Sequence, residues 1–390
     1  MGSPRDIAAD VTRQRKIAAL TLEQIISAYR GDRPLARAST IPSTWYTDPR
    51  VLELERDAVF ARAWQVAGRV DEVSAPGNYL ACELSGGEPI VVARAEDHVL
   101  RGFFNVCRHH AAAVVTDASG STRHFRCPYH GWTYALDGTL KGTPDFTGVC
   151  DFDRSANGLV PIESATCEKW VFVRLHPGGA SLSDYLGPTL LTQLQALGLR
   201  DLHWIERRHY TLDCNWKVFV DNYLDGGYHV PHLHKGLDSV LNYSEYVIEI
   251  GERHCLQTSP LVSDGADTQT GAVRTGNRAS YYWIYPNFMI NRYGRAMDTN
   301  LVIPRGVDKT EVIFDFYFAD VSAAARADNL ASIAVSEQIQ EEDVAICVSV
   351  QRGLRSRAYD TGRLSVRREA GEHLFHRLLH GDLVAGLRDT

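Results

Sequence analysis

Two pairs of cysteine and histidine residues have the spacing of metal ligands. Cys107 and His109 are separated by one residue, and Cys127 and His130 are separated by two. Two thiolates and two imidazoles on neighbouring loops form the ligand set of a [2Fe–2S] cluster in which histidine replaces two of the four cysteines. A zinc site with two cysteines and two histidines uses the same residue types at similar spacings. The β-rich sequence on both sides and the small residue Gly131 favour the cluster, and zinc stays open as the alternative.

Three histidines within six residues form a second group with metal-binding composition. His229, His232 and His234 follow a segment that contains carboxylates, as a facial triad of two histidines and one carboxylate requires. On a regular helix His229 and His232 share a face, whereas His229 and His234 lie about 140° apart, because each residue turns the helix by ~100°. Pro231 breaks or bulges such a helix. The pair His229 and His234 is therefore possible as well.

A later helical segment offers a carboxylate as the third ligand. In VSEQIQEEDVAICVSVQRG, Asp343 falls on an apolar stripe that consists of Val335, Ile339, Ile346 and Val350. A carboxylate on a buried face is unfavourable unless it is paired or bound to a metal. Asp343 is therefore expected to be either part of a salt bridge or a ligand.

The elements that must carry these residues differ between the two halves of the chain. Residues 79–174 alternate short β-branched runs with turn residues, which predicts an all-β domain. The segment at 177–188 is rich in Gly, Pro and Ser and predicts a domain boundary. Beyond it, strand-like runs are flanked by helical segments near 215–230 and 322–353, which predicts helices over an antiparallel sheet. The expected fold class is α+β, with a short capped helix over 21–30 in front.

Composition and charge exclude several classes of protein. A net charge of −7 gives no basic field for nucleic acid, and no run of eighteen apolar residues exists to cross a membrane. The N-terminus lacks the apolar region of a secretory signal, and Asp6 and Asp10 disfavour an organellar transit peptide. Eight cysteines in 390 residues are too sparse for a disulfide scaffold. We therefore expect a cytoplasmic protein with no nucleic-acid or membrane partner.

The metal-binding segments resemble those of a known family. CRHH and CPYHGWTYALDG are similar to the cluster loops of the Rieske non-haem iron oxygenases, and DNYLDGGYHVPHLH and EDVAICVSVQRGL are similar to their second metal site. The similarity covers residues 43–380 with scattered gaps. Within the family, the chain most resembles plant-type choline monooxygenases. The resemblance implies the cluster ligands Cys107, His109, Cys127 and His130 and the iron ligands His229, His234 and Asp343. Glu342 is the alternative to Asp343.

The resemblance also implies a domain organisation. We expect an N-terminal helical segment at 1–44 that packs on the catalytic domain, an all-β Rieske domain at 45–180, and a catalytic domain at 181–390. The catalytic domain would be of the helix-grip type, in which helices cover an antiparallel sheet. His110 stands where family members commonly carry Arg, and we expect it not to be a ligand. His232 is expected to be either a partner of a ligand or a surface residue.

In the family, electrons pass from the cluster of one subunit to the iron of the next. The resemblance therefore implies a head-to-tail homotrimer with an acidic residue that bridges the two centres. Relatives often place this acid three residues before the first histidine ligand, where this chain has Gly226. Asp225 lies one residue earlier and can take the role if the chain bulges at the glycines, and Asp221 is the alternative. The sequence has no dinucleotide-binding fingerprint, so electrons from NAD(P)H must arrive through a separate reductase or ferredoxin.

The resemblance to choline monooxygenases implies a small amine as the substrate. Aromatic faces bind quaternary ammonium groups, and the candidates are Tyr281, Trp283, Tyr285 and Tyr293. The alternative is that these aromatics only pack a sheet. We expect hydroxylation of choline or a related quaternary ammonium compound, with N-oxygenation of a small heteroaromatic amine or N-demethylation as the alternative. An iron–sulfur electron carrier without oxygenase activity is the alternative from another class, and it would need no second iron site.

Overall fold

The computed structural model describes residues 20–262 and 269–389, and the chain divides into two compact units. One unit is Phe60–Pro188, and the other joins the chain before Phe60 to the chain from Thr189 onward. The boundary at Pro188 lies at the end of the segment in which a boundary was expected. The first boundary differs from the expected one, because residues 45–59 fold with the catalytic unit. Trp45 illustrates this packing, because its buried ring stacks on His380 near the end of the chain, with ring centroids 6.1 Å apart.

The unit Phe60–Pro188 is built on an antiparallel sheet of seven strands in the order β1-β10-β9-β4-β3-β2-β5. Alternate residues of β3 enter apolar clusters on opposite faces, Val91 and Ala93 on one and Ile90 and Val92 on the other, as the period of two in a strand requires. A second sheet has the order β6-β7-β8. The strands are β1 (Gln65–Arg69), β2 (Asn78–Glu83), β3 (Pro89–Arg94), β4 (Leu100–Phe104), β5 (Ser119–Ser121), β6 (His124–Arg126), β7 (Thr133–Ala135), β8 (Leu140–Gly142), β9 (Pro161–Cys167) and β10 (Trp170–Arg174).

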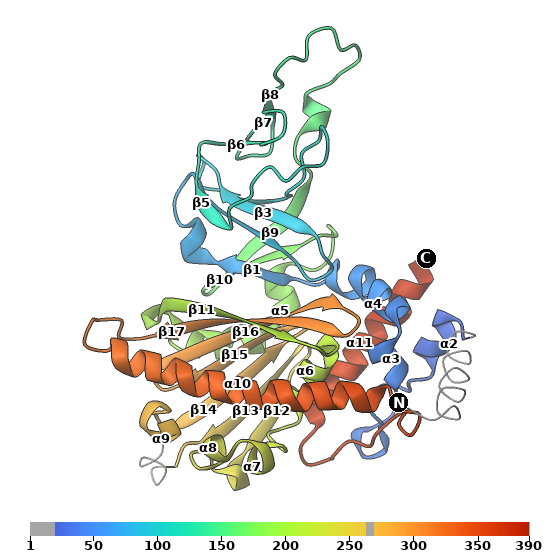
Figure 1. The fold of residues 1–390 in the computed structure, drawn as a ribbon, viewed down its shortest axis with the longest axis vertical. Coiled ribbons are helices and arrows are strands. Elements are labelled where there is room, and N and C mark those ends of the chain that lie inside the picture. Colours follow the sequence, from blue (N-terminus) through green and yellow to red (C-terminus); the bar gives the residue numbers. More distant parts are fainter. Residues whose placement is uncertain (1–19, 263–268, 390) are drawn as a thin grey trace, which may run out of the picture. The chain divides into compact units, whose positions relative to one another are not determined.

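The other unit contains an antiparallel sheet with the strand order β11-β17-β16-β15-β14-β13-β12. Its long helix α10 (Arg326–Leu354) crosses one face of this sheet (Figure 1), and α6 (Trp216–Leu224) contacts both α10 and the strands β16 and β17. The strands are β11 (His203–Leu212), β12 (Val247–Ile250), β13 (His254–Pro260), β14 (Arg278–Ile284), β15 (Phe288–Tyr293), β16 (Ala296–Gly306) and β17 (Lys309–Phe318). The expected architecture, helices over an antiparallel sheet, is confirmed.

Shorter helices complete the described part of the chain. The helix expected near 21–30 is α2, and its predicted capping box is present, since Thr21 and Gln24 exchange hydrogen bonds between side chain and backbone. The other α-helices are α3 (Ser43–Thr47), α4 (Pro49–Glu55), α5 (Leu182–Ala196), α7 (Val230–Leu233), α8 (Lys235–Asp238), α9 (Gln269–Val273) and α11 (Ala370–Asp389), and α2 is Leu22–Ser27. Within the described ranges, none of the helices combines the length and the hydropathy that crossing a membrane requires.

The helix expected near 215–230 is shorter than predicted. It ends at Leu224, because Gly226 and Gly227 both have φ near +69°, a left-handed conformation that stops a right-handed helix. A Cβ on Gly226 would lie 2.1 Å from the carbonyl oxygen of Arg368, so only glycine fits there. The chain therefore turns sharply just before the histidine-rich segment.

The buried face of α10 also differs from the prediction. Ile346 and Val350 are 37% and 43% exposed, so the C-terminal half of the expected apolar stripe does not face the core. The face that is buried is mostly polar and repeats at the 3.6-residue period of a helix, with Ser332, Ser336, Gln340, Cys347 and Gln351 on it. A search for apolar periodicity cannot find such a face. Asp343 lies on its edge, with a side chain that is 14% exposed.

Candidate metal centres and substrate cavity

The two loops that carry the cysteine–histidine pairs have the same backbone hydrogen bonds. In each loop the cysteine N–H donates to the carbonyl five residues later, and its own carbonyl accepts from the N–H four residues later. The bonds join Cys107 to Ala112 (2.8 Å) and Ala111 (3.0 Å), and Cys127 to Trp132 (2.8 Å) and Gly131 (3.0 Å). Ala111 and Gly131 both have positive φ, at +60° and +72°. The loops, one after β4 and one between β6 and β7, therefore present their ligands in equivalent ways.

The side chains of the two loops lie close together over an apolar core. Cys107 and Cys127 are both 3% exposed and belong to the same apolar cluster. The rings of His109 and His130 lie with centroids 4.7 Å apart, and Trp132 stacks on His109 at 4.7 Å with an interplanar angle of 9°. Burial raises the pKa of the Cys127 thiol, and the neighbouring Cys107 thiol raises it further. Two neighbouring thiols in an apolar pocket are stabilised when a metal ion displaces their protons and binds the thiolates.

The loop residues fit a two-iron cluster better than a single ion. The Nδ1 atom of His109 is buried and has no hydrogen-bond partner among the described residues, as expected for an atom that a metal satisfies. A tetrahedral zinc ion would draw all four ligand atoms together. In the part of the chain that the structure describes, two groups of three or more such residues bring their ligand atoms within 4.8 Å of one another, and neither contains a cysteine. His110, which is exposed, contacts His109 edge-on, with ring centroids 4.1 Å apart and an interplanar angle of 60°.

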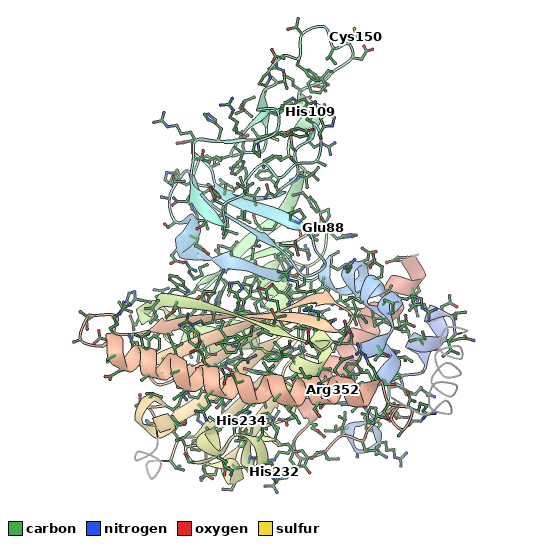
Figure 2. The ribbon with its side chains drawn as sticks, viewed as in Figure 1. Glu88, His109, Cys150, His232, His234 and Arg352 are labelled. Atoms are coloured by element: carbon green, nitrogen blue, oxygen red, sulfur yellow. The ribbon has the colours of Figure 1, made fainter. Side chains whose placement is uncertain are left out.

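The histidine-rich segment forms a turn around the short helix α7. His229 precedes this helix and His234 follows it with φ −106° and ψ 76°, so the segment is not one regular helix. The break expected from Pro231 is confirmed, and it brings the rings of His229 and His234 to 4.9 Å. His234 is 1% exposed, whereas His232 lies at the surface (Figure 2). Of the two roles expected for His232, the structure agrees with the surface residue.

Asp343 of α10 completes a group of three potential ligands with His229 and His234. Its Oδ1 lies 3.1 Å from His234 Nε2 and 3.9 Å from His229 Nε2, and ligand atoms of all three residues lie within 4.8 Å of one another. Asn222 Nδ2 donates to the same oxygen at 2.7 Å. Burial lowers the pKa of His234, but Asp343 and Glu342 outweigh burial, and the pKa is raised. The group therefore favours a positive charge, which is what a site for Fe(II) requires.

Each of the two histidines is held by a carboxylate at its other ring nitrogen. His229 Nδ1 lies 2.6 Å from Asp225 Oδ2, and His234 Nδ1 lies 2.6 Å from Glu342 Oε2. Such carboxylate partners fix the tautomer and orientation of metal-binding histidines and leave the Nε2 atoms free to face a metal. Glu342, the alternative to Asp343, therefore contacts a histidine on the side away from the potential metal.

Asp225 and Asp221 have different surroundings. Asp225 also accepts a hydrogen bond from the backbone N–H of His229 at 3.0 Å, and the bulge that this arrangement needs is present at the two glycines. Asp221 instead accepts from Tyr46 Oη at 2.5 Å and lies 3.0 Å from His376 Nε2. Of the two acids, only Asp225 contacts a residue of the His229, His234 and Asp343 group among the contacts described.

A cavity opens beside this group of residues, and its wall is rich in aromatic and amide side chains. The aromatic residues are Phe219, Tyr223, Tyr246, Tyr281, Tyr293 and Phe314, and the amides are Asn222, Gln257, Asn291, Asn300 and Gln340. Burial raises the pKa of Tyr293 to about 12 and raises that of Tyr281 well above its usual value. The phenols are therefore neutral at physiological pH and present their ring faces and hydroxyl groups.

Two of the four predicted substrate residues line this cavity, and two do not. Tyr281 and Tyr293 are in the wall, and their hydroxyl groups are hydrogen-bonded at 3.0 Å. Trp283 lies farther along β14 and Tyr285 directly follows this strand, and both pack on α11, where Trp283 contacts Phe375 and Tyr285 Oη donates to Asp382. The prediction that Trp283 and Tyr285 contact the substrate is therefore corrected. Alternation along a strand shows which residues share a face, but it does not show how far a cavity extends along that face.

Sequence reasoning missed the other polar residues of the cavity wall, among them Asn222, Arg274 and Asp298. All three line the cavity, and Arg274 and Asp298 are both 5% exposed. Asn222 lies on α6 and donates to Asp343 of α10, but the helix ends at Leu224, so its spacing from the histidines gives no signal for this contact. Arg274 and Asp298 have no signal either, because nothing local in the sequence shows that they are buried.

Profiles of two protein families match the chain, one in each unit. The profile described as "Rieske [2Fe-2S] domain" matches residues 63–153. The profile described as "Ring hydroxylating alpha subunit (catalytic domain)" matches residues 199–381. The first range contains both cysteine–histidine loops, and the second contains the His229, His234 and Asp343 group.

Relatives of known activity match nearly the whole chain. The chloroplastic choline monooxygenase of Arabidopsis thaliana is 40% identical over 95% of this chain and 89% of its own length. The carnitine monooxygenase oxygenase subunit of Escherichia coli is 29% identical over 83% of this chain and 86% of its own. A solved quaternary ammonium Rieske monooxygenase, described in connection with carnitine oxidation and inter-subunit electron transfer, matches with a TM-score of 0.81 and 28% identity over 90% of this chain and 97% of its own. Naphthalene 1,2-dioxygenase from Rhodococcus, at 23% identity and a TM-score of 0.74 over 89% of this chain and 94% of its own, shares the fold.

Proposed function

Because the chain belongs to the Rieske non-haem iron oxygenase family, we propose that it is the oxygenase component of a monooxygenase that oxidises a quaternary ammonium compound. Hydroxylation of choline or a related compound is the expected reaction. The observation that carries this proposal is the aromatic cavity beside His229, His234 and Asp343. An electron carrier has no use for such a cavity or for a second metal site, so both features argue against that alternative.

We assign each metal group to the residues that fit it. Cys107, His109, Cys127 and His130 would hold the [2Fe–2S] cluster, and His229, His234 and Asp343 would hold a mononuclear Fe(II). When bound, the iron supplies O₂ activation and the cluster supplies electrons one at a time. The chain itself has to present two Nε2 atoms and one carboxylate oxygen toward the same point, and it does so through the contacts of Asp225, Glu342 and Asn222.

We assign the bridging role between the centres to Asp225. Its carboxylate holds His229 Nδ1, and a carboxylate that can also accept a hydrogen bond from a histidine of the Rieske loops would link the two ligand sets. Asp221 would then hold α6 in place through its contacts with Tyr46 and His376, and it would not contact a metal ligand. This assignment predicts that the two acids have separable effects on electron transfer.

The cavity supports a cationic substrate through its aromatic faces. A trimethylammonium group gains about 0.5–2 kcal/mol at each aromatic face on which it rests, and it makes no hydrogen bond that the wall must satisfy. Tyr246, Tyr281 and Phe314 are the candidates for such faces. N-demethylation would use the same aromatic faces for the ammonium group, but the carbon to be hydroxylated would be an N-methyl group instead of the carbinol carbon of choline. N-oxygenation of a neutral heteroaromatic amine would use the amides instead.

We further propose that the enzyme is a cytoplasmic homotrimer that receives electrons from a separate reductase or ferredoxin. Support for the trimer comes from the inter-subunit electron transfer described for the solved relative. All eight cysteines are free thiols in the structure, as a reducing compartment leaves them.

Oxygen uptake by the purified protein tests the proposal. With a compatible reductase and NADH, quaternary ammonium compounds should give uptake that is coupled to an oxidised product, identified by mass spectrometry. Turnover of neutral heteroaromatic amines with none of the quaternary compounds would replace the proposal by N-oxygenation. Electron transfer through the cluster with no uptake on any amine would favour the electron carrier.

A further inference from the structure

A buried arginine forms part of the wall of the substrate cavity. Arg274 is 5% exposed and lines the same cavity as His234 and Asp343. Its Nη1 donates to Ser332 Oγ at 2.8 Å and its Nη2 donates to Ser336 Oγ at 2.6 Å. The guanidinium carbon lies 4.4 Å from the centre of the Tyr293 ring. The side chain is thus fixed in one position by two hydroxyl groups and one aromatic face.

The charge of this guanidinium is not balanced by an ion pair. Both hydrogen-bond acceptors are neutral, the Nε atom is buried without a partner, and within the described ranges no carboxylate forms a salt bridge with Arg274. Asp298 lines the same cavity, but its carboxylate is occupied by the amides of Asn291 and Asn300, and burial raises its pKa in spite of the nearby Arg274. A buried cation with only neutral partners is unfavourable, and an anion that enters the cavity removes this cost.

The arginine is held away from the metal ligands along α10. Ser332, Ser336 and Asp343 share one face of this helix, and Arg274 bonds to the two serines. With a rise of 1.5 Å per residue, the serines lie roughly 10–17 Å from Asp343 along the helix axis. Because the arginine side chain can itself reach along the cavity, this spacing of helix positions indicates only that the guanidinium is displaced from the metal ligands along α10.

We propose that Arg274 binds a carboxylate at the end of the substrate away from the metal, so that the preferred substrate is a zwitterion whose ammonium and carboxylate groups are several bonds apart. This inference rests on the proposed function and narrows its substrate class. Choline ends in a hydroxyl group and leaves the guanidinium unpaired. In glycine betaine one carbon separates the two charges, so its carboxylate stays closer to the ammonium group than that of γ-butyrobetaine, whose two charges are three carbons apart. Because Arg274 covers the face of Tyr293, the other aromatic residues have to receive the ammonium group.

The inference is tested with compounds that share a trimethylammonium group and differ at the other end. Substrate-coupled oxygen uptake should give a kcat/KM for γ-butyrobetaine at least tenfold above those for choline and glycine betaine. Arg274→Gln should lower the value for γ-butyrobetaine at least tenfold more than the value for choline, since a charge-assisted bond to a carboxylate is lost in one case only. Arg278→Gln is the matched control: this exposed arginine bonds to Thr258 outside the cavity, and its loss should change neither value.

A binding measurement separates this inference from the proposed function. Equilibrium dialysis of radiolabelled γ-butyrobetaine against the holoenzyme without O₂ should show binding that Arg274→Gln weakens at least tenfold. Arg274→Lys keeps the charge without the planar fork and should retain part of the preference over choline, which covers the case in which the glutamine variant does not fold. Equal or better use of choline by the wild type, or an equal loss for both compounds in Arg274→Gln, would overturn the inference while the proposed function stands. Absence of turnover with every quaternary compound would overturn the proposed function, and Arg274-dependent binding in the dialysis would still support the carboxylate site.

Discussion

The loops that carry the cysteine–histidine pairs and the segment around His229 hold their potential ligands by different means. In the loops, both cysteines are fixed by the same pair of backbone hydrogen bonds, and the four residues lie within residues 107–130. In the catalytic unit, His234 and Asp343 are 109 residues apart, and side-chain carboxylates and an amide hold the group. A site fixed by backbone tolerates changes of nearby side chains. A site fixed by side chains loses activity by a graded amount, according to whether the lost side chain is a ligand or the partner of a ligand.

The largest effect is expected at Asp343. Replacement by alanine should lower substrate-coupled oxygen uptake by about 10³-fold or more, beyond the 10–100-fold that the loss of an outer hydrogen-bond partner costs. The mononuclear iron should be lost, and the visible spectrum of the cluster should be unchanged. Glu341→Ala removes an exposed carboxylate two residues away on the same helix and should behave like the wild type. Loss of the cluster spectrum in Asp343→Ala would contradict the claim that the two metal sites are held independently.

The buried pair of Lys217 and Glu55 tests whether the two units are stabilised separately. Both side chains are fully buried, with Lys217 Nζ 2.7 Å from Glu55 Oε1, and Trp216 Nε1 also donates to Glu55. Lys217→Met leaves the carboxylate without its cation, which should lower the free energy of unfolding of the catalytic unit by about 3–5 kcal/mol. Urea titration followed by far-UV circular dichroism should show this loss, while bleaching of the cluster absorbance should keep its midpoint. The double variant with Glu55→Gln should recover part of the loss.

A smaller effect is expected when a carboxylate partner of a histidine is changed. Asp225→Asn should lower oxygen uptake about 10–100-fold with both metal groups retained, because the amide cannot hold His229 in the same tautomer. Single-turnover reoxidation of the reduced cluster should slow by a similar factor. Asp221→Asn is the control of matched chemistry and should affect reoxidation less. A larger effect at Asp221 would transfer the bridging role to that residue.

The smallest effect is expected at His110, which lies beside the cluster loops and is exposed. Replacement by Arg adds a fixed positive charge near His109 and should raise the reduction potential of the cluster by tens of millivolts, since a nearby cation stabilises the reduced state and solvent screens it. Redox titration followed by visible absorbance measures this shift. His176→Arg adds the same charge at an exposed position outside both loops and should shift the potential less. A shift in the negative direction would contradict the account of His110 as an electrostatic neighbour.

The same contrast explains which features could be predicted from the sequence. The cluster pairs are local, so spacing alone pointed to Cys107, His109, Cys127 and His130 as a metal site. The pairing of His229 with His234 could not be derived from helical geometry, which prefers His232, and it needed the resemblance to a family. The structure shows the physical reason, a four-residue helix between the two ligands and a turn at two left-handed glycines.

Other features depend on packing that no local pattern records. Period-two alternation placed Tyr281, Trp283 and Tyr285 on one face of a strand, but the packing of α11 on Trp283 and Tyr285 decides where the cavity ends. Apolar periodicity missed the buried face of α10 because that face consists mainly of serines and glutamines that serve the cavity and its neighbours. Arg274 belongs to the same category, since its burial against this face is a tertiary effect.

Iron and acid-labile sulfide analysis of the purified protein tests most directly the claim that one chain carries two distinct metal centres. The account predicts three irons and two sulfides per chain, and two irons with two sulfides in Asp343→Ala. Two irons in the wild type, or a single zinc with no sulfide, would contradict it.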